Sequence, residues 1–386
     1  MKNKEHNVEI ADIFYKYNHA FCANHKLHPV QKRAFEDIVK CRSAELGGHM
    51  ERCEHCSYTR YAYNSCRNRH CPKCQYVKQV QWVDQLKSRI LPVKHFHLVF
   101  TIPSCLHSLF YSNQAIAYDL LFKAATKALK SCAMNPKFLG AQTGAVAVLH
   151  TWGRQLNYHP HIHMIVPGGG LSEDDMEWVH TGHKFLLPVK VLSMLFRAIL
   201  CSLLEKALGN NRLSLPDDIA DYKQLKSLCY KKNWNVYAKK PFANADRIID
   251  YLGKYTHRVA ISNHRIVALE NNKVSFRCKD KRTGKYTQII TLTANEFIRR
   301  FLQHILPCGF YKIRYIGIMA LGCAKQKMDS CLEIMNITDV SLPSLPGLNA
   351  IDVFREITGK DPNKCPRCKT GKMVFITLKL CSQARR

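Results

Sequence analysis

The spacing of apolar residues along the chain predicts a mixture of helices and short strands. Helical periodicity marks segments at 8–45, with a break at 26–29, and at 77–90, 113–139 and 185–208. Apolar or alternating runs bounded by Gly, Pro and Asn predict strands at 94–103, 144–152, 161–166, 234–241, 258–261, 264–269, 273–279 and 286–292. The polar stretch 209–233 is expected to be a loop. This order of elements indicates an α+β fold.

The strand at 161–166 carries two histidines that can share one metal ion. Because side chains alternate along a strand, His161 and His163 lie on the same face. Imidazoles are frequent metal ligands, so we interpret the pair as a metal site for phosphodiester chemistry. The alternative is two surface histidines beside a turn. His150 ends the preceding strand and is the best-placed third ligand, with His159 and Gln155 as competitors.

A second H-x-H pattern occurs earlier in the chain. His95 and His97 open a run, 98–102, that is apolar except for its threonine. Such a run is typical of a central, buried strand. We therefore expect His97 to be at most a neighbour of the metal site.

A predicted amphipathic helix at 244–256 carries two tyrosines. Tyr251 and Tyr255 are four residues apart and are therefore neighbours on the helix surface. A tyrosine at the edge of a core usually packs its ring and leaves its hydroxyl in water. The surrounding basic residues favour a second interpretation, in which both hydroxyls lie near a phosphate. These basic residues are Lys254, His257 and Arg258.

Closely paired cysteines near the N-terminus are typical of zinc sites. Cys53–Cys56 and Cys71–Cys74 each have C-x-x-C spacing, and together they can close one tetrahedral Zn²⁺ site. Free buried cysteines are the alternative, but both pairs lie among polar residues. Cys66 and His70 are further ligand types within the segment. Its basic side chains would face phosphate; they are Arg67, Arg69 and Lys73.

A third cysteine pair lies near the C-terminus. Cys365 and Cys368 form half of a zinc ribbon, and the other half is either Cys381 or the N-terminal module. The chain has 18 cysteines but no export signal, so the pairs indicate metal sites in a reducing cytoplasm.

The charge balance indicates a polyanionic partner. Lys and Arg number 58 against 29 Asp and Glu, which gives a formal net charge of +29. Released counterions favour each phosphate contact of so basic a protein. An anionic membrane surface is the alternative, but the basic residues are spread along the chain and no apolar run reaches about 18 residues. We therefore expect DNA as partner and no membrane.

A second basic surface is expected near the predicted helix 293–305, which Thr293 and Glu296 can open as a capping box. The alternative is an ordinary solvated face. Its basic residues are Arg299, Arg300, Lys312, Arg314 and Lys325.

Several motifs together resemble one protein family. HPHIHMIVPGGG at 159–170, followed by YLGKYTHRVAISNHRI at 251–266, is similar to the HUH-type, two-tyrosine rolling-circle transposases of bacterial insertion sequences, the IS91 group. CRNRHCPKC, HFHLVFTIP and FIRRFLQHILPCGFYKIRYIG also match, in the family order; they occupy 66–74, 95–103 and 297–317.

The resemblance implies a specific chemistry. Tyr251 and Tyr255 would be nucleophiles that cut and rejoin single-stranded DNA through a 5′-phosphotyrosine intermediate, and His161 and His163 would hold Mg²⁺ or Mn²⁺. The DNA partners would be single-stranded or hairpin ends of the element and target DNA. The zinc would be structural.

The resemblance also implies a domain order. A helical and zinc-binding DNA-recognition module at 1–88 would precede an antiparallel-sheet HUH nuclease domain, flanked by helices, at 89–265. A basic β-hairpin and helix region at 266–345 and a linker with a C-x-x-C tail at 346–386 would follow.

Two other functions fit parts of the sequence. A plasmid or phage replication initiator uses the same chemistry, but the N-terminal cysteine module and C-terminal basic motifs favour the transposase. A non-catalytic, zinc-dependent DNA-binding regulator accounts for the charge and the cysteines, yet leaves the H-x-H pattern and the tyrosine pair unexplained.

Overall fold

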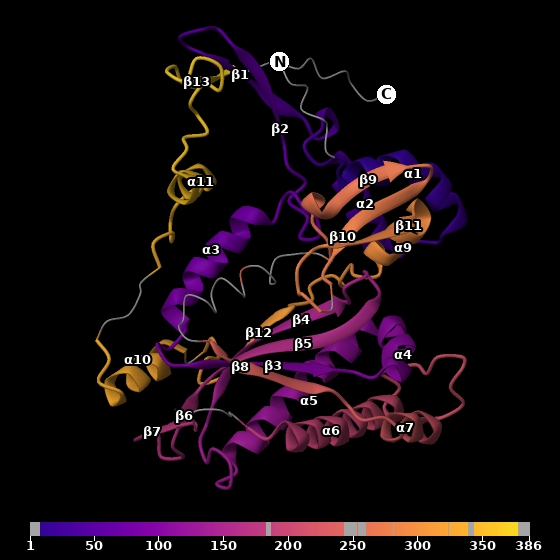
Figure 1. Ribbon diagram of the computed structural model, residues 1–386, viewed down its shortest axis with the longest axis vertical. Coiled ribbons are helices and arrows are strands. Elements are labelled where there is room, and N and C mark those ends of the chain that lie inside the picture. Colours follow the sequence, from indigo (N-terminus) through magenta and orange to yellow (C-terminus); the bar gives the residue numbers. More distant parts are fainter. Residues whose placement is uncertain are drawn as a thin grey trace.

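The centre of the molecule is a five-stranded antiparallel sheet in the order β12–β4–β5–β3–β8 (Figure 1). The computed structural model describes residues 8–182, 187–242, 253, 260–280, 282–322, 324–338 and 343–376. The strands are β3 (His95–Thr101), β4 (Gly144–Trp152), β5 (Tyr158–Pro167), β8 (Val236–Phe242) and β12 (Ile313–Gly317). The four strands predicted in this part of the chain are confirmed, and so is the α+β class.

Helices cover one face of this sheet and form the largest core with it. Leu98, Phe100, Ile162 and Met164 are fully buried on that face. The apolar sides of long helices pack against them, as the predicted helical periodicity requires. The covering helices are α4 (His107–Ser112), α5 (Gln114–Met134), α6 (Val189–Gly209) and α7 (Tyr222–Tyr230).

Helix α7 corrects the loop expected at 209–233. Asp221 caps it, because its carboxylate accepts a hydrogen bond from the Gln224 backbone N–H at 2.8 Å. Leu225 and Cys229, four residues apart, are its two buried side chains. So narrow an apolar stripe does not stand out against the polar composition of the segment.

The opposite face of the sheet is covered by α3 (Tyr76–Leu86) and α10 (Ala324–Ile334). Leu86 packs in one cluster with Val146, Val148 and Ile165. Trp82 of α3 donates its indole N–H to the Tyr315 hydroxyl on β12 at 3.0 Å. The predicted helix at 77–90 is therefore confirmed, and it lies over the face of β5 that bears the H-x-H histidines.

A second unit joins the N-terminal helices to residues beyond 260. Helices α1 (Ile10–Asn24) and α2 (Pro29–Lys40), with the predicted break between them, pack against α9 (Ala294–Leu302). The sheet behind α9 is β11–β10–β9, composed of β9 (Ile266–Glu270), β10 (Lys273–Cys278) and β11 (Gln288–Thr293). Figure 1 shows these helices and strands together beside the upper end of the central sheet.

Aromatic rings hold this second unit together. Phe14 stacks on Phe35 with ring centroids 4.5 Å apart and meets the edge of Phe301 at 5.2 Å. All three rings are buried. Aromatic pairs in these geometries stabilise a core beyond the apolar area they bury.

The capping box predicted for α9 is only half formed. Thr293 caps the helix by accepting from the Glu296 backbone N–H at 3.3 Å. The Glu296 carboxylate instead accepts from the guanidinium groups of Arg299 and Arg300. These charge-assisted bonds are stronger than a bond to a neutral backbone N–H.

The third unit is a small sheet made by a hairpin after α2 and the last described strand. Strands β1 (Gly48–Cys53) and β2 (Thr59–Tyr63) form a hairpin, and β13 (Met373–Ile376) pairs with β1. Helix α11 (Ala350–Thr358) precedes β13, and a further hairpin consists of β6 (Gly169–Leu171) and β7 (Trp178–His180). Short 3-10 turns occupy Ala44–Leu46, Lys87–Arg89, Ser104–Leu106 and Asn263–Arg265. The described part of the strand expected at 258–261, residues 260 and 261, is not in a strand, and the rest lies outside the described residues. Among the described residues, no helix is long and apolar enough to span a bilayer.

The aromatic cluster predicts a large effect of one truncation. Phe14→Ala should lower the free energy of unfolding by about 3–5 kcal/mol, because it leaves a cavity between Phe35 and Phe301. Chemical denaturation followed by circular dichroism measures the change. Tyr15→Ala is the matched control, since Tyr15 is 72% exposed, and it should change stability by less than about 0.5 kcal/mol. Equal losses in both variants would contradict this packing.

His304 predicts a pH dependence of stability. Its Nε2 donates to the Leu156 carbonyl at 3.1 Å, so its Nδ1 can accept from the Thr151 hydroxyl only while the ring is neutral. Burial lowers the pKa of His304 to about 4, from an ordinary value of 6.5. Between these values the unfolded chain binds more protons, so stability falls as the pH falls, by at most about 1.4 kcal/mol per pH unit for this group.

The non-titrating variant His304→Gln tests this dependence. Wild type should lose more stability than His304→Gln between pH 7 and pH 5 in urea denaturation. Acid loss of any bound metal affects both proteins and cancels in the difference. The same pH slope in both would show that His304 does not titrate in this range.

Candidate active site and metal centres

Three histidines meet on the α3 side of the central sheet. His150 of β4 lies directly opposite His161 of β5, and Val148 lies opposite His163. Paired residues of antiparallel strands share a face, so these imidazoles point the same way. One ring nitrogen from each histidine lies within 4.8 Å of those of the other two. The structure therefore brings His150, the expected third ligand, to the H-x-H pair.

Hydrogen bonds fix which ring nitrogens are available. His161 Nδ1 donates to the His159 carbonyl at 2.7 Å, which leaves Nε2 with a lone pair. Burial lowers the pKa of His161 to about 4, so the ring is neutral at neutral pH. A neutral imidazole oriented by a backbone carbonyl is the usual form of a metal-binding histidine.

The second H-x-H pattern supports the first. His97 on β3 shares the face of His163, with Nε2 of His97 2.7 Å from Nδ1 of His163 and the rings stacked at 5.0 Å. This contact engages Nδ1 of His163, whose ring contributes one nitrogen to the converging group. His97 is therefore the neighbour that was expected, and it orients His163. His95 is fully buried, and its Nδ1 donates to the Val93 carbonyl at 2.8 Å.

The competing third ligands differ in how near they lie to the three histidines. The ring of His159 lies near both His161 and His107, at centroid distances of 5.3 Å and 5.7 Å. Gln155 is in the turn between β4 and β5, where its carbonyl accepts from Arg300 at 3.0 Å. His159 does not belong to the group of converging nitrogens found among the described residues.

The donor set restricts the choice of cation. The group found among the described residues consists of three imidazoles and no carboxylate. Mg²⁺ prefers oxygen ligands, whereas imidazole nitrogen suits transition-metal ions. Of the two cations expected from the sequence, Mn²⁺ fits these residues better.

Of the predicted tyrosine helix at 244–256, the structure describes one residue, Gly253. Tyr251, Tyr255, Lys254, His257 and Arg258 lie outside the described residues, but Gly253 does not. Its carbonyl accepts a hydrogen bond from the Gln79 side chain of α3. A Cβ at Gly253 would lie 2.8 Å from Val83 Cγ2, so any larger residue there would force Val83 to shift. Because α3 covers the histidine face of the sheet, Gly253 lies on that side of the molecule.

The first cysteine cluster differs from the one predicted. Cys41, Cys66, Cys71 and Cys74 have sulfur atoms within 4.8 Å of one another. Cys74 Sγ lies 3.4 Å from Cys41 Sγ and 3.6 Å from Cys66 Sγ. The expectation that 53/56 and 71/74 form one site is therefore wrong. Cys41, at the end of α2, was missed because no nearby cysteine gives it a recognisable spacing.

The second cluster joins two distant cysteine pairs. Cys53 and Cys56, at the tip of the β1–β2 hairpin, meet Cys365 and Cys368, again within 4.8 Å. The N-terminal module, one of the two partners expected for Cys365 and Cys368, therefore lies beside that pair. Cys381, the other, lies outside the described residues.

His70 and Arg69 have structural partners instead of the expected ones. His70 is buried; its Nε2 accepts from the Leu306 backbone N–H at 3.0 Å, and burial lowers its pKa to about 3. The Arg69 guanidinium donates to the carbonyls of Phe310 and Pro307, each at 2.5 Å. His70 is therefore not a metal ligand, and the hydrogen bonds of Arg69 hold the 306–310 segment.

Acidic partners pair with several of the other basic residues. Lys73 forms an ion pair with Glu9, and Glu296 binds both Arg299 and Arg300. Arg67 remains exposed. In the second expected basic surface, Arg314 pairs with Asp119, and burial lowers the pKa of Lys312 to about 7.

Comparisons with known proteins agree with this architecture. A family model described as "Putative transposase" matches residues 144–327, and one described as "Transposase zinc-binding domain" matches residues 13–102. The first match contains the three histidines, and the second contains both N-terminal cysteine pairs. No solved structure matches the chain.

Two curated relatives cover nearly the whole chain. The "Putative transposase y4qJ" of Sinorhizobium fredii (strain NBRC 101917 / NGR234) is 42% identical over 381 residues, which is 96% of this chain and 95% of the relative. The "Transposase for insertion sequence element IS801" of Pseudomonas savastanoi pv. phaseolicola is 28% identical over 358 residues, 90% of this chain and 84% of the relative. The resemblance inferred from the motifs is confirmed: the chain belongs to the IS91 family of insertion-sequence transposases, with an N-terminal transposase zinc-binding domain.

Proposed function

We propose that this transposase cuts and rejoins single-stranded DNA with Tyr251 and Tyr255 as nucleophiles, in rolling-circle transposition. The observation that carries the proposal is the convergence of His150, His161 and His163 on the sheet face where Gly253 packs against α3. Gly253 lies between the two tyrosines in sequence, and the proposed mechanism needs their hydroxyls near the histidines.

The histidines would hold Mn²⁺ or Mg²⁺, and the ion would offset the negative charge of the scissile phosphate. The hydroxyl oxygen of one tyrosine attacks phosphorus and forms a phosphotyrosine ester with the 5′ side of the cut. The bond to the 3′ oxygen breaks, and that oxygen takes up a proton to give a free 3′-hydroxyl. The ester retains the energy of the broken bond, so a DNA 3′-hydroxyl can reverse the step without ATP. Two tyrosines permit two successive transfers.

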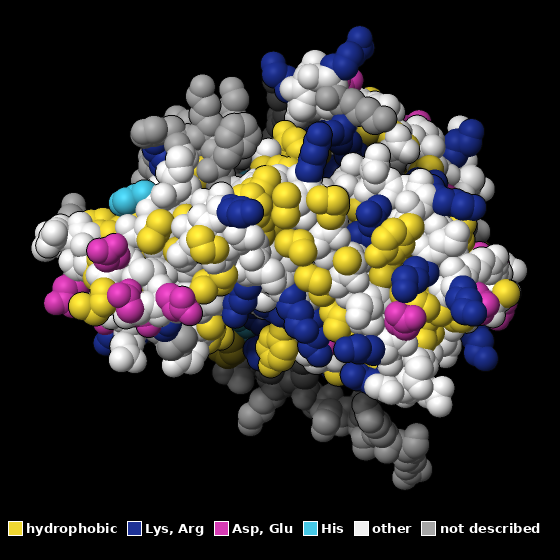
Figure 2. Space-filling view, turned by 90° about the horizontal axis from the view of Figure 1, so that it is seen from below, with side chains coloured by type: hydrophobic (Ala, Val, Ile, Leu, Met, Phe, Trp, Pro, Cys, Tyr) yellow, Lys and Arg dark blue, Asp and Glu magenta, His cyan; other side chains and the backbone are white. Residues whose placement is uncertain are grey.

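The net charge of +29 supports contact with long stretches of the DNA backbone. Figure 2 shows Lys and Arg side chains scattered over the lower face of the molecule. The proposed phosphate contacts that lie nearest the nucleophiles in sequence are Lys254, His257 and Arg258. In the zinc-binding module, the proposed phosphate contact Arg67 is exposed. Lys73, Arg299 and Arg300 would have to exchange their carboxylate partners for phosphate.

A replication initiator would use the same chemistry, and the transposase family membership argues against it. A non-catalytic DNA-binding regulator would not need three converging imidazoles. Incubation with labelled single-stranded DNA and Mn²⁺ separates the enzyme from the regulator. A covalent adduct that survives denaturation supports the enzyme, and its absence supports the regulator.

The histidine cluster predicts a separation of cleavage from binding. His161→Ala and His163→Ala should each lower the rate of adduct formation with Mn²⁺ by at least about 100-fold, since each removes a ligand of the ion that stabilises the transition state. DNA affinity in a gel-shift assay should change little. His180→Ala is the control, because His180 is exposed on β7, and it should keep full activity. His95→Ala should matter much less than either ligand variant; equal losses in all four would contradict this assignment.

The tyrosine pair predicts an outcome that packing alone cannot produce. Phenylalanine keeps each ring and removes only the hydroxyl. At least one of Tyr251→Phe and Tyr255→Phe should still form an adduct on a single-stranded oligonucleotide. Neither single variant should complete transposition. The double variant should form no adduct. Peptide mapping of the wild-type adduct should place DNA on residue 251, on residue 255 or on both. Full transposition by either single variant, or DNA attached to another residue, would overturn the two-tyrosine mechanism.

A further inference from the structure

We propose that Cys53, Cys56, Cys365 and Cys368 bind a second zinc ion, distinct from one bound by Cys41, Cys66, Cys71 and Cys74. The second ion would fasten the C-terminal segment to the N-terminal hairpin. Cys365 and Cys368 lie far outside residues 13–102, which match the zinc-binding domain. The zinc-binding module of this chain would therefore need the C-terminal cysteine pair as well as the N-terminal one.

The sulfur positions fit a tetrahedral ion. Cys53 Sγ lies 3.7 Å from Cys368 Sγ, and Cys56 Sγ lies 3.6 Å from Cys365 Sγ. A tetrahedron with Zn–S bonds of about 2.3 Å has sulfur–sulfur edges of about 3.8 Å. A disulfide requires about 2.05 Å, so the observed spacing suits four thiolates around one ion better than two bridges.

Backbone hydrogen bonds shape both cysteine pairs for this role. The backbone N–H groups of His55 and Cys56 each point at Cys53 Sγ, at 3.4 Å. Gly371 N–H points at Sγ of Cys368, the second cysteine of the other pair, at 3.3 Å. Such N–H···S contacts stabilise negative charge on sulfur and hold each pair in a ligand-binding turn.

The two pairs are held together by the small sheet. Cys53 lies opposite Met373 in the β1–β13 ladder, and the Glu54 N–H donates to the Lys372 carbonyl at 3.1 Å. A Cβ at Gly371 would lie 2.5 Å from Cys53 Sγ, so a larger residue there would push the pairs apart. Few apolar side chains surround the sulfurs; the buried ones near them are Cys53, Cys365 and Met373. So small a core is typical of modules that a metal ion stabilises.

The path of the tail brings its cysteines to the hairpin independently of any metal. The buried carboxylate of Asp84 on α3 accepts from the Leu345 backbone N–H at 2.7 Å and from the Ser344 hydroxyl at 3.4 Å. The Gln81 side chain, one turn earlier, donates to the Leu348 carbonyl. The segment before α11 is thus attached to α3, and Figure 1 shows α11 near α3 on the way to β13.

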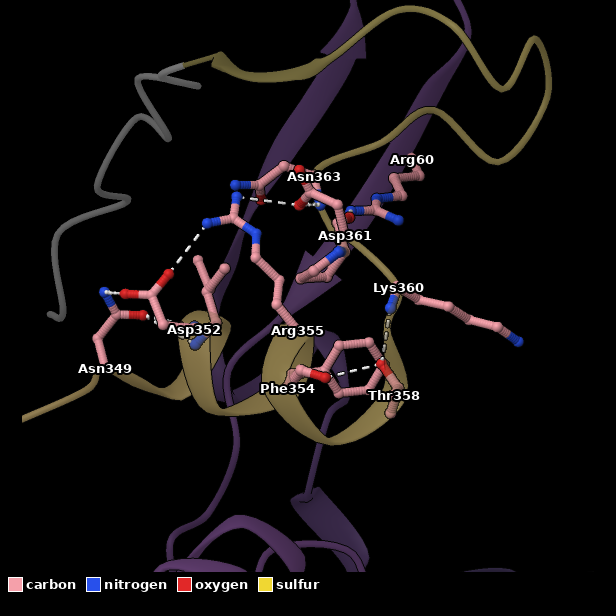
Figure 3. Close-up of polar contacts among 11 residues, drawn as sticks. Arg60, Asn349, Asp352, Phe354, Arg355, Thr358, Lys360, Asp361 and Asn363 are labelled. Atoms are coloured by element: carbon pink, nitrogen blue, oxygen red, sulfur yellow. Dashed lines mark hydrogen bonds and ion pairs between the residues drawn. The ribbon is translucent and has the colours of Figure 1, made fainter. Parts of the chain in front are cut away.

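A second set of polar contacts continues from α11 to the hairpin (Figure 3). Arg355 binds Asp352 within the helix and Asp361 beyond it, each at 3.0 Å. Arg60 of β2 donates to the Pro362 carbonyl at 3.0 Å. These contacts place Cys365 three residues after a point already bound to β2. The tail pair is therefore presented to Cys53 and Cys56 by the fold itself.

Metal content per chain tests the proposal. The full-length protein, purified under reducing conditions, should contain two zinc ions by elemental analysis and native mass spectrometry. Cys365→Ser and Cys368→Ser should each contain one, Cys41→Ser should contain one, and Cys41→Ser/Cys365→Ser should contain none. Cys22→Ser is the matched control, because Cys22 is exposed and belongs to neither cluster, and it should keep two.

Two further measurements keep the test decisive if a serine variant folds poorly. Cys365→His keeps a zinc ligand and should retain two ions. In the wild type, replacing zinc by Co²⁺ should give tetrahedral thiolate–cobalt absorption of about twice the intensity seen for Cys368→Ser. One ion per wild-type chain, or two ions in Cys365→Ser, would overturn the proposal. None of these readouts depends on DNA cleavage, so they stand or fall separately from the proposed function.

Discussion

The register between β4 and β5 is the constraint on which the candidate active site depends. It sets His150 opposite His161 and places His163 one pair further along the same face. A slip of β5 by one residue would move His161 and His163 to the face covered by α5 and α6. That face is apolar, and Ile162 and Met164 are fully buried there. Because buried imidazoles without partners cost several kcal/mol, the large core on one face fixes the histidines on the other.

The elements were predictable from the sequence where the apolar pattern is strong. The strand predicted at 144–152 has the same bounds as β4, since its residues are buried on both faces. The break before Pro29 was predictable because proline starts a helix readily and cannot continue one. Helix α7 was not, because two buried side chains leave its polar composition dominant.

The candidate site was predictable only in part, because long-range pairing leaves little trace in spacing. His161 and His163 are marked by a period of two, and His150 by its place at a strand end. Cys41 has no such mark, since α2 brings it to Cys66 through the packing of the second unit. Arg69 looked like a phosphate contact, yet its guanidinium holds backbone carbonyls more than two hundred residues away. Composition gives the sign of the net charge, but it does not say which Lys and Arg side chains can contact DNA.

The packing of Phe14 against Phe301 has a consequence for synthesis of the protein. Ribosomes add about 5–20 residues per second, so roughly a quarter of a minute to one minute separates the two rings during translation. For that time α1 and α2 are outside the ribosome without α9, and their apolar surface has no partner. The newly made N-terminal helices are therefore exposed to proteases and chaperones. A chain that stops before residue 301 lacks the α9 side of this core, so the complete second unit appears only once translation is nearly complete.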